Sequence, residues 1–256
     1  IKDGRSVNEL LALPSNHQLS SSEVAFAKQI LFGSLRYYHQ LKAILDQLLE
    51  KPLKEKDLDI YSILLSGVYQ LKYLSVPDHA AISESVDLAQ KMKKKWASGL
   101  INAVLRGYQR RNEAIAEKLG HAATYQFSHP NWIINQIKND WANDYQQILE
   151  QNNQRAPMFI RVNTQHNDLS TYQERLNKVS IESERHTAAQ DALLLLKPCD
   201  VFSLPGFSEG DVTVQDAAPQ LVVEMMGLEP NLNVLEGCAA PGGKTMHILQ
   251  REPTTR

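Results

Sequence analysis

Apolar residues recur at three- and four-residue steps through most of residues 1–125, which is the spacing of one face of an α-helix. The helix-start signature Ser20-Ser-Ser-Glu23 precedes the first apolar stretch, and Pro52 ends it. The apolar stretches cover residues 24–49, 58–74, 79–89 and 96–108. Few β-branched runs and no hairpin dipeptides interrupt them, so the pattern predicts an all-α bundle.

From residue 129 short apolar runs alternate with helical stretches. The strand-like runs are Met158–Val162, Ala192–Leu196, Val212–Gln215 and Leu232–Leu235. The helical stretches are 131–141, 164–179, a helix capped by Asp216 that runs to Met226, and 244–250. We expect the aromatic side chains Tyr37, Tyr38, Trp132 and Trp141 to lie in the core. Strands that alternate with helices predict an α/β fold for this half of the chain.

The last of these strands has a consequence for the whole chain. A parallel strand buries both faces and needs neighbours in its sheet, which one strand–loop–helix unit does not supply. The chain also begins with Ile1 instead of Met. We therefore expect it to be a fragment of a longer protein.

Composition narrows the class of protein. Apolar residues make up 43% and charged residues 22% of the chain, which excludes disordered and fibrous proteins. No apolar run reaches the ~18 residues of a membrane span, so no membrane contact is predicted. The two cysteines, Cys199 and Cys238, exclude a disulfide framework and a four-cysteine zinc site, and they fit the reducing cytoplasm. His79, His129 and His247 lack ligand spacing, so we predict no metal and assign them to capping or packing.

Charge is spread unevenly along the chain. Residues 1–120 hold 17 Lys and Arg against 13 Asp and Glu, whereas residues 121–256 hold 10 against 16. This asymmetry favours two units and places any preference for a polyanion on the first. The strongest basic cluster comprises Lys91, Lys93, Lys94, Lys95, Arg106, Arg110 and Arg111, with Trp96, Asn102 and Tyr108 nearby. Salt-sensitive RNA binding and an ordinary solvated helix end are the alternatives for this basic cluster.

The stretch Glu236–Thr245, with the sequence EGCAAPGGKT, carries the most chemical information. Its glycines let backbone approach a ligand, and the start of the following helix offers unpaired N–H groups. A phosphate-binding P-loop needs glycine five positions before Gly243, where Cys238 stands. The dinucleotide pattern G-x-G-x-x-G is absent as well.

S-adenosylmethionine is the third cofactor class considered for this loop. Its methionine carboxylate can bind exposed loop N–H groups, and Glu236 offers a negative charge for its ammonium. An ordinary glycine-rich turn is the alternative without a ligand.

Cys238–Thr245 resembles the first cofactor motif of the RNA cytosine-C5 methyltransferases of the Fmu/Sun type. Leu204–Phe207 with Gly210, and Val212–Ala217, resemble the segment that precedes the nucleotide-binding fold of that family. Pro157–Asn163 resembles its pre-catalytic RNA-binding subdomain. Val76–Ala81 and Gly99–Arg106 resemble the NusB-like helical domain of the bacterial 16S rRNA methyltransferase B group. The resemblance covers essentially the whole chain, in order.

The resemblance implies three domains. Residues 1–125 are expected to form an all-α NusB-like RNA-binding domain, and residues 126–212 a pre-catalytic α/β RNA-binding subdomain. Residues 213–256 are expected to begin a Rossmann-like methyltransferase domain that is incomplete in this chain.

The resemblance also implies a reaction with 16S rRNA. In that family a cysteine thiolate adds to C6 of cytosine, C5 then accepts the methyl group of S-adenosylmethionine, and loss of the C5 proton gives 5-methylcytosine. The residues that match the cofactor motif are Cys238, Ala239, Ala240, Pro241, Gly242, Gly243 and Lys244. Arg161 and Asn163, which flank Val162, are candidates for RNA contact, with a solvated strand face as the alternative.

No catalytic residue is assigned within these 256 residues. The nucleophilic cysteine, the product-releasing cysteine and the ribose-binding carboxylate of the family are expected beyond Arg256. Cys238 in the cofactor loop would lie under the ligand, and Asp200 opposes the effect of Lys197 on Cys199. Glu236 stands where the family has Asp. We expect weak or no cofactor binding and no turnover from this chain alone; a non-catalytic NusB-like module that binds RNA or protein is the alternative function.

Overall fold

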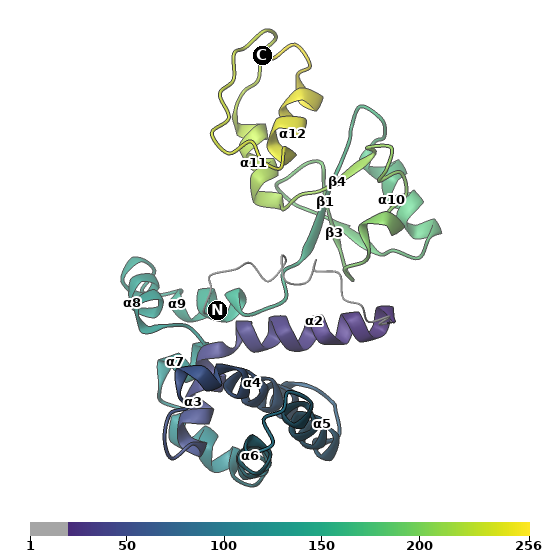
Figure 1. The fold of residues 1–256 in the computed structure, drawn as a ribbon. Coiled ribbons are helices and arrows are strands. Elements are labelled where there is room, and N and C mark those ends of the chain that lie inside the picture. The colour runs from purple at the N-terminus through teal and green to yellow at the C-terminus, as the bar shows by residue number, and fades with distance from the viewer. Residues whose placement is uncertain (1–19) are drawn as a thin grey trace. The chain divides into compact units, whose positions relative to one another are not determined.

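The computed structural model describes residues 20–256. The chain divides into two compact units, residues 1–154 and 155–256 (Figure 1). The helices at residues 131–140 and 145–152 therefore belong to the first compact unit, although they follow the predicted boundary. The domain boundary predicted near residue 125 is a division by sequence family, and it stays a prediction.

The described part of the first unit is helical, as predicted. Its helices are α2 (Ser21–Arg36), α3 (Tyr38–Leu48), the short 3₁₀ helix η1 (Glu55–Asp57), α4 (Leu58–Tyr73), α5 (Asp78–Lys91), α6 (Ala97–Leu119), α7 (Ala123–Phe127), α8 (Asn131–Asp140) and α9 (Tyr145–Asn152). The capping box at the start of α2 is present, because Glu23 N–H donates to Ser20 Oγ and Ser20 N–H donates to the Glu23 carboxylate. The apolar stripes of α3, α4, α5 and α6 meet in one core that includes Leu41, Leu45, Leu64, Ile101 and Leu105.

The first apolar stretch was expected to form one helix, and this expectation is wrong. The stretch forms two helices, α2 and α3, separated at Tyr37. The Ser128 hydroxyl takes the place of a helical hydrogen bond here: it accepts from Gln40 N–H at 3.3 Å and donates to the Arg36 carbonyl at 3.3 Å. A side chain inserted between residues i and i−4 is a recognised cause of a helix break.

The assignment of Trp132 and Trp141 to the core is also wrong, since 72% and 60% of these residues are exposed. The face of α8 that packs on Phe127 and Leu149 carries Ile134 and its neighbours Ile133 and Ile137. Trp132 lies about 200° around the helix from Ile134, on the opposite side. Trp141 lies just past the end of α8.

The second unit is built on a four-stranded antiparallel sheet with strand order β2-β3-β1-β4. Its elements are β1 (Met158–Val162), α10 (Leu169–Lys178), β2 (Ser183–Arg185), β3 (Ala192–Leu195), the 3₁₀ helix η2 (Val201–Ser203), β4 (Val212–Val214), α11 (Ala217–Met225) and α12 (Gly243–Arg251). Strands combined with helices agree with the predicted α/β class. The edge strand β2 was not predicted, because three residues are too few to show an alternating pattern.

The two faces of the sheet differ in chemistry. Ile160 and Val162 of β1 pack with Tyr172 and Leu176 of α10 in an apolar cluster. Successive side chains of a strand point to opposite faces, so Arg161 lies on the other face. There the backbone of β1 contacts α11, and Arg161 hydrogen-bonds to α12.

The strand predicted at 232–235 does not form in this structure. Val234 N–H donates to the carbonyl of Arg256 at 2.7 Å, and Arg256 N–H donates to Leu232 O at 2.9 Å. These two bonds pair the segment with Arg256, but the segment does not join the four-stranded sheet. The absence of neighbouring strands beside it explains the difference, since a strand is defined by ladder pairing.

Candidate cofactor-binding site

The predicted cofactor loop leads directly into α12. Residues Cys238–Pro241 are exposed, and the helix begins at Gly243. Gly242 has φ +105°, in the left-handed region that favours glycine, and the Ala240–Pro241 peptide bond is cis. A Cβ atom at Gly242 would have space, because its nearest neighbour would be Ala239 O at 4.0 Å. The backbone conformation, and not crowding, therefore requires glycine at this turn.

Polar side chains close the base of the loop. The Lys244 ammonium donates to Cys238 O at 3.2 Å and lies 3.5 Å from Glu236 Oε1. The Thr245 hydroxyl donates to the Glu236 carboxylate. These contacts tie the start of the loop to the first turn of α12.

The loop fits the ligand chemistry expected of S-adenosylmethionine. Helix geometry leaves the amides of the first turn, from Gly243 to Thr245, without a carbonyl partner inside the helix. Such amides favour a carboxylate. Glu236 supplies an acidic group beside them, although Lys244 and Thr245 already contact it.

Arg161, predicted to contact RNA, is instead among the largest fully buried side chains, with 1% exposure. Its Nε donates to Gln215 Oε1 at 2.7 Å, and its Nη1 donates to Gln250 Oε1. Burial lowers the pKa of the guanidinium to about 10, with the Asp191 carboxylate acting in the opposite direction. Arg161 therefore stays charged at neutral pH.

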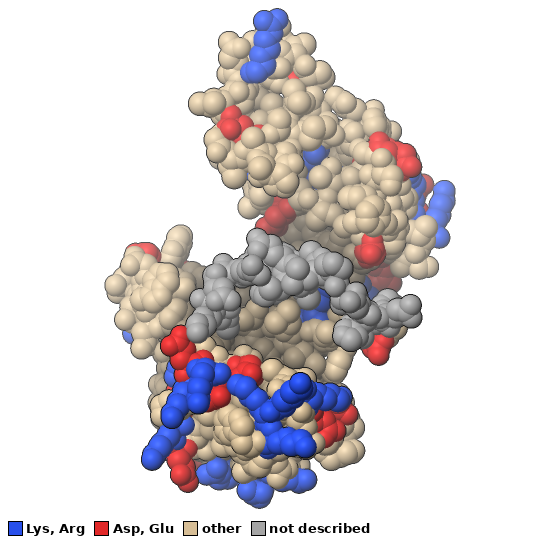
Figure 2. Space-filling view, in the orientation of Figure 1, with Lys and Arg blue, Asp and Glu red and all other residues tan. Residues whose placement is uncertain are grey.

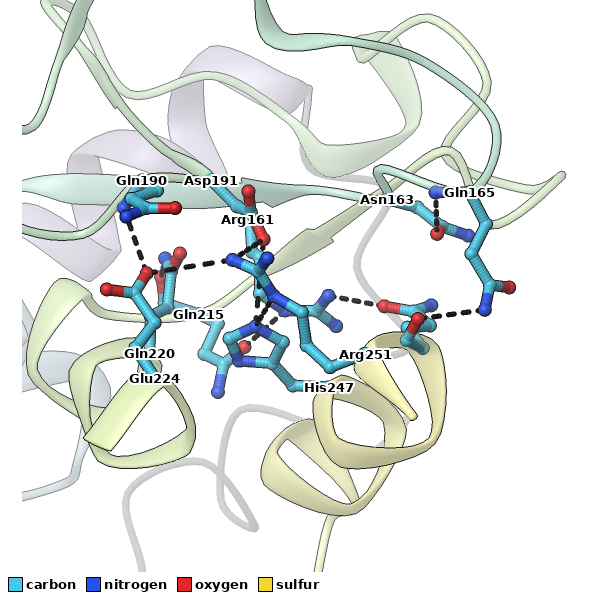
Figure 3. Close-up of polar contacts among 11 residues, drawn as sticks. Arg161, Asn163, Gln165, Gln190, Asp191, Gln215, Gln220, Glu224, His247 and Arg251 are labelled. Carbon is cyan, nitrogen blue, oxygen red and sulfur yellow. Dashed lines mark hydrogen bonds and ion pairs between the residues drawn. The ribbon is translucent and has the colours of Figure 1, made fainter. Parts of the chain in front are cut away.

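A second set of contacts lies beside Arg161 on the same face of the sheet (Figure 3). Asp191 Oδ2 is 2.7 Å from Arg251 Nη2 and 3.7 Å from His247 Nε2, and the Asp191 and His247 side chains are buried. Gln220 donates to Gln215 O at 2.9 Å. We call these residues with Arg161 the polar network: Arg161, Asp191, Gln215, Gln220, His247, Gln250 and Arg251. Among residues 20–256, the buried atoms Arg161 Nη2, Gln215 Nε2, Gln220 Oε1 and His247 Nδ1 find no hydrogen-bond partner.

Asn163, the other candidate for RNA contact, is 5% exposed. Its side-chain amide donates to Gly210 O at 3.0 Å and accepts from Gln165 N–H at 3.2 Å, which shapes the turn after β1. A solvated strand face is therefore wrong for both Arg161 and Asn163. Contact of either residue with RNA stays a prediction.

The basic cluster lies at the end of α5 and along α6 of the first unit. Figure 2 shows Lys and Arg gathered on the visible face of this unit, with acidic side chains among them. Lys94 is not free, because it pairs with Asp57 at 3.3 Å and Asp59 at 2.7 Å. The other basic residues of the cluster are exposed, as is Trp96, whereas Tyr108 is buried.

Other sequence-based assignments concern metals, membranes and cysteines. Within residues 20–256, no group of three or more His, Cys, Asp or Glu side chains could hold a metal ion, and no helix is long and apolar enough to cross a membrane. Both cysteines are free: Cys199 is partly buried against the apolar cluster of the second unit, and Cys238 is exposed.

Sequence reasoning did not find most of the polar network. Asp191, Gln215 and the adjacent pair Gln250 and Arg251 come from three separate stretches, and no spacing rule connects them. One signal was present: a charged residue, Arg161, inside the apolar run Met158–Val162 predicts a buried charge with partners elsewhere.

Comparison with known proteins defines the class. Residues 1–110 match the NusB family, and residues 129–202 match the Methyltr_RsmF/B-like, ferredoxin-like domain. The chain thus carries a NusB-family domain followed by an RsmF/B-like ferredoxin-like domain, which confirms the predicted fold class.

The chain is a homologue of proteins named ribosomal RNA small subunit methyltransferase B. It is 43% identical to the protein of that name from Pseudomonas syringae pv. tomato, over 88% of this chain and 50% of the relative. It is also 43% identical to the one from Vibrio cholerae, over 96% of this chain and 57% of the relative. The chain therefore spans about half the length of the curated relatives it matches.

A solved structure supports the fold. The crystal structure of PH0851 matches 91% of this chain and 53% of its own chain with a TM-score of 0.69. The two sequences are 17% identical, so this likeness concerns the fold alone.

Proposed function

We propose that the protein methylates C5 of a cytosine in 16S rRNA with S-adenosylmethionine, which residues 238–244 bind. The observation that carries the proposal is the exposed loop before α12, with Gly242 in the left-handed region at the start of the helix. The names of the relatives support an rRNA methyltransferase.

Each group in the loop has a proposed task. The first amides of α12 hold the carboxylate of the cofactor, and Glu236 receives its ammonium. Lys244 and Thr245 keep the Glu236 carboxylate beside the loop. The cofactor, when bound, supplies an electrophilic methyl group.

The proposal includes a cysteine thiolate that forms a bond to C6 of the target cytosine. The electron pair that reaches C5 takes the methyl group from the sulfonium, and S-adenosylhomocysteine leaves; a base then removes the C5 proton, which expels the thiolate and restores the ring. Cys199 is not assigned this task because it is packed against the core of the second unit, and Cys238 is not because it belongs to the cofactor loop.

The experiment uses protein expressed from the complete gene, labelled cofactor and unmodified 16S rRNA. We expect 5-methylcytosine at one position by mass spectrometry, and the same rate from Cys199→Ser. RNA substituted with 5-fluorocytidine should trap the covalent adduct on a cysteine other than Cys199 and Cys238. Methylation at another base atom, or an adduct on either of these two cysteines, contradicts the proposal.

One observation favours a second candidate function, a non-catalytic RNA-binding module. The exposed lysines and arginines of the basic cluster suit the RNA backbone. RNA binding that weakens with salt, without any affinity for S-adenosylhomocysteine, would select this function over the first.

A further inference from the structure

Arg161 is linked to both ends of α12, directly at the C-terminal end and through another side chain at the N-terminal end. Its Nε bond fixes the amide of Gln215, and that amide lies against the first residue of the helix: a Cβ built on Gly243 would be 3.8 Å from Gln215 Cδ. Its Nη1 bond reaches Gln250 in the last turn. One buried side chain of β1 therefore bonds directly to the last turn of a nine-residue helix and, through Gln215, is linked to the surroundings of its first residue.

The neighbouring contacts of the polar network hold the same helix mainly at its C-terminal half. Asp191 contacts His247 and Arg251, and Gln165 Nε2 donates to Gln250 O at 2.8 Å. Gln220 in turn donates to the carbonyl of Gln215 and fixes its backbone. The contact of Arg161 with Gln215 is the part of this network that reaches toward Gly243, where the cofactor loop ends.

We infer that Arg161 is a positioning residue, which acts through Gln215 and Gln250 to hold α12 and the Gly242–Gly243 turn in the conformation that the cofactor loop requires. The inference rests on the proposed function, because it concerns the same loop. It assigns Arg161 to the cofactor site instead of to RNA. Direct contact with RNA would require a side chain that is 1% exposed to leave the network.

The chain offers a matched set of variants. Arg161→Met removes both hydrogen bonds and keeps a long side chain, whereas Arg161→Lys keeps the charge. Gln250→Leu removes only the link to the last turn. Arg185→Met is the control: Arg185 lies on β2 of the same sheet, and in the described part of the chain its side chain bonds to Gln173 and Ser170, away from α12.

Protein from the complete gene is titrated with S-adenosylhomocysteine and, separately, with 16S rRNA. We expect Arg161→Met to raise the Kd of S-adenosylhomocysteine about tenfold, which corresponds to about 1.4 kcal/mol, because the amides at the start of α12 are no longer held in place. The Kd of rRNA should stay within about twofold, and Arg161→Lys should recover part of the affinity for the cofactor. Arg185→Met should change neither constant.

A measurement without ligand tests the positioning directly. The Met246 amide donates to Gly242 O at 2.8 Å in the first turn of α12, and its hydrogen exchange should quicken about tenfold in Arg161→Met. If Arg161→Met does not fold, Gln215→Leu, which removes the link between Arg161 and the start of α12, carries the same two tests. An ordinary structural role would lower Tm and leave the cofactor Kd and the Met246 exchange of the folded protein unchanged, which overturns the inference.

Two further outcomes separate the hypotheses. If Arg161→Met weakens the binding of rRNA and leaves the Kd of S-adenosylhomocysteine unchanged, Arg161 contacts RNA, and the inference is overturned. Wild-type protein that binds no S-adenosylhomocysteine contradicts the proposed function, whereas the exchange measurement at Met246 still decides whether Arg161 positions the turn.

Discussion

The two units differ in how their helices are held. Helices α3 to α6 of the first unit bury an apolar core, and none of the charged side chains on these four helices is buried. In the second unit, the face of the sheet toward α11 and α12 buries Arg161, Asp191, Gln220 and His247. Apolar contacts are non-directional, whereas hydrogen bonds fix angle and distance. We therefore infer that apolar packing mainly stabilises the first unit, whereas directional hydrogen bonds fix the position of α12 in the second unit.

The largest expected effect comes from a cavity in the apolar core of the first unit. Leu45 is fully buried in the core of the first unit, so Leu45→Ala should cost about 3 kcal/mol of its free energy of unfolding through lost transfer energy and a cavity. Urea unfolding followed by circular dichroism measures this. Leu88→Ala is the control, because Leu88 is 45% exposed and should lose less than about 0.5 kcal/mol. Equal losses would contradict the assigned core.

The next largest effect concerns an ion pair of the polar network in the second unit. Asp191→Ala leaves Arg251 without its partner at 2.7 Å and should destabilise the second unit by about 2 kcal/mol. This is less than a fully buried pair would lose, because the Arg251 side chain is 31% exposed. The double variant Asp191→Ala/Arg251→Met should regain part of the loss in the same urea titration. Additive losses would show that the two side chains are not coupled.

A smaller effect sharpens the account of the break between α2 and α3. Ser128→Ala removes the hydroxyl that bridges Gln40 N–H and Arg36 O, which should cost about 1–2 kcal/mol and quicken exchange of the Gln40 amide. Ser83→Ala, which removes an exposed hydroxyl bound to Ala80 O, is the control. Unchanged exchange at Gln40 would mean that the two helices join when the hydroxyl is absent.

The smallest effect depends on pH. A hydrogen bond from Arg175 holds the pKa of Asp211 below its ordinary value, with a further contribution from His166. A carboxyl with a lowered folded pKa contributes stability above its unfolded pKa of about 3.9, and loses it as the pH falls through the folded value. Asp211→Asn should therefore cost about 1 kcal/mol at pH 6 in urea titrations, and this cost should shrink as the pH falls below the unfolded pKa and through the folded one. A difference independent of pH would exclude this ion pair as its source.

Local signals in the sequence predicted most of the helices and strands. The Ser20 capping box, the cap at Asp216 and the run Met158–Val162 act within a few residues, and the structure confirms each of them. The break near Tyr37 was missed because its cause, Ser128, is 88 residues from Gln40. The strand at 232–235 was predicted from composition, which does not supply the neighbours that a strand needs.

In the candidate site, too, the features that are local in sequence were predicted and the contacts between distant residues were not. The turn before α12 was predicted because its glycines and its helix start are contiguous in sequence, and the structure places Gly242 there with a left-handed φ. Cofactor binding by this loop stays a prediction. The partners of Arg161 were not predicted, because Gln215 and Gln250 are 54 and 89 residues away. Contacts over such separations depend on the fold, and the local patterns of a single sequence do not predict them.

The most direct test of the cofactor loop is a calorimetric titration of the complete gene product with S-adenosylhomocysteine and, in parallel, with ATP. Gly242→Val forces a β-branched residue into a left-handed conformation, while Gly210→Val does the same at a turn outside the loop and serves as the control. We predict that wild type and Gly210→Val bind S-adenosylhomocysteine but not ATP, and that Gly242→Val loses this binding. Tight binding of ATP by the wild type, or undiminished S-adenosylhomocysteine binding by Gly242→Val, would contradict the account.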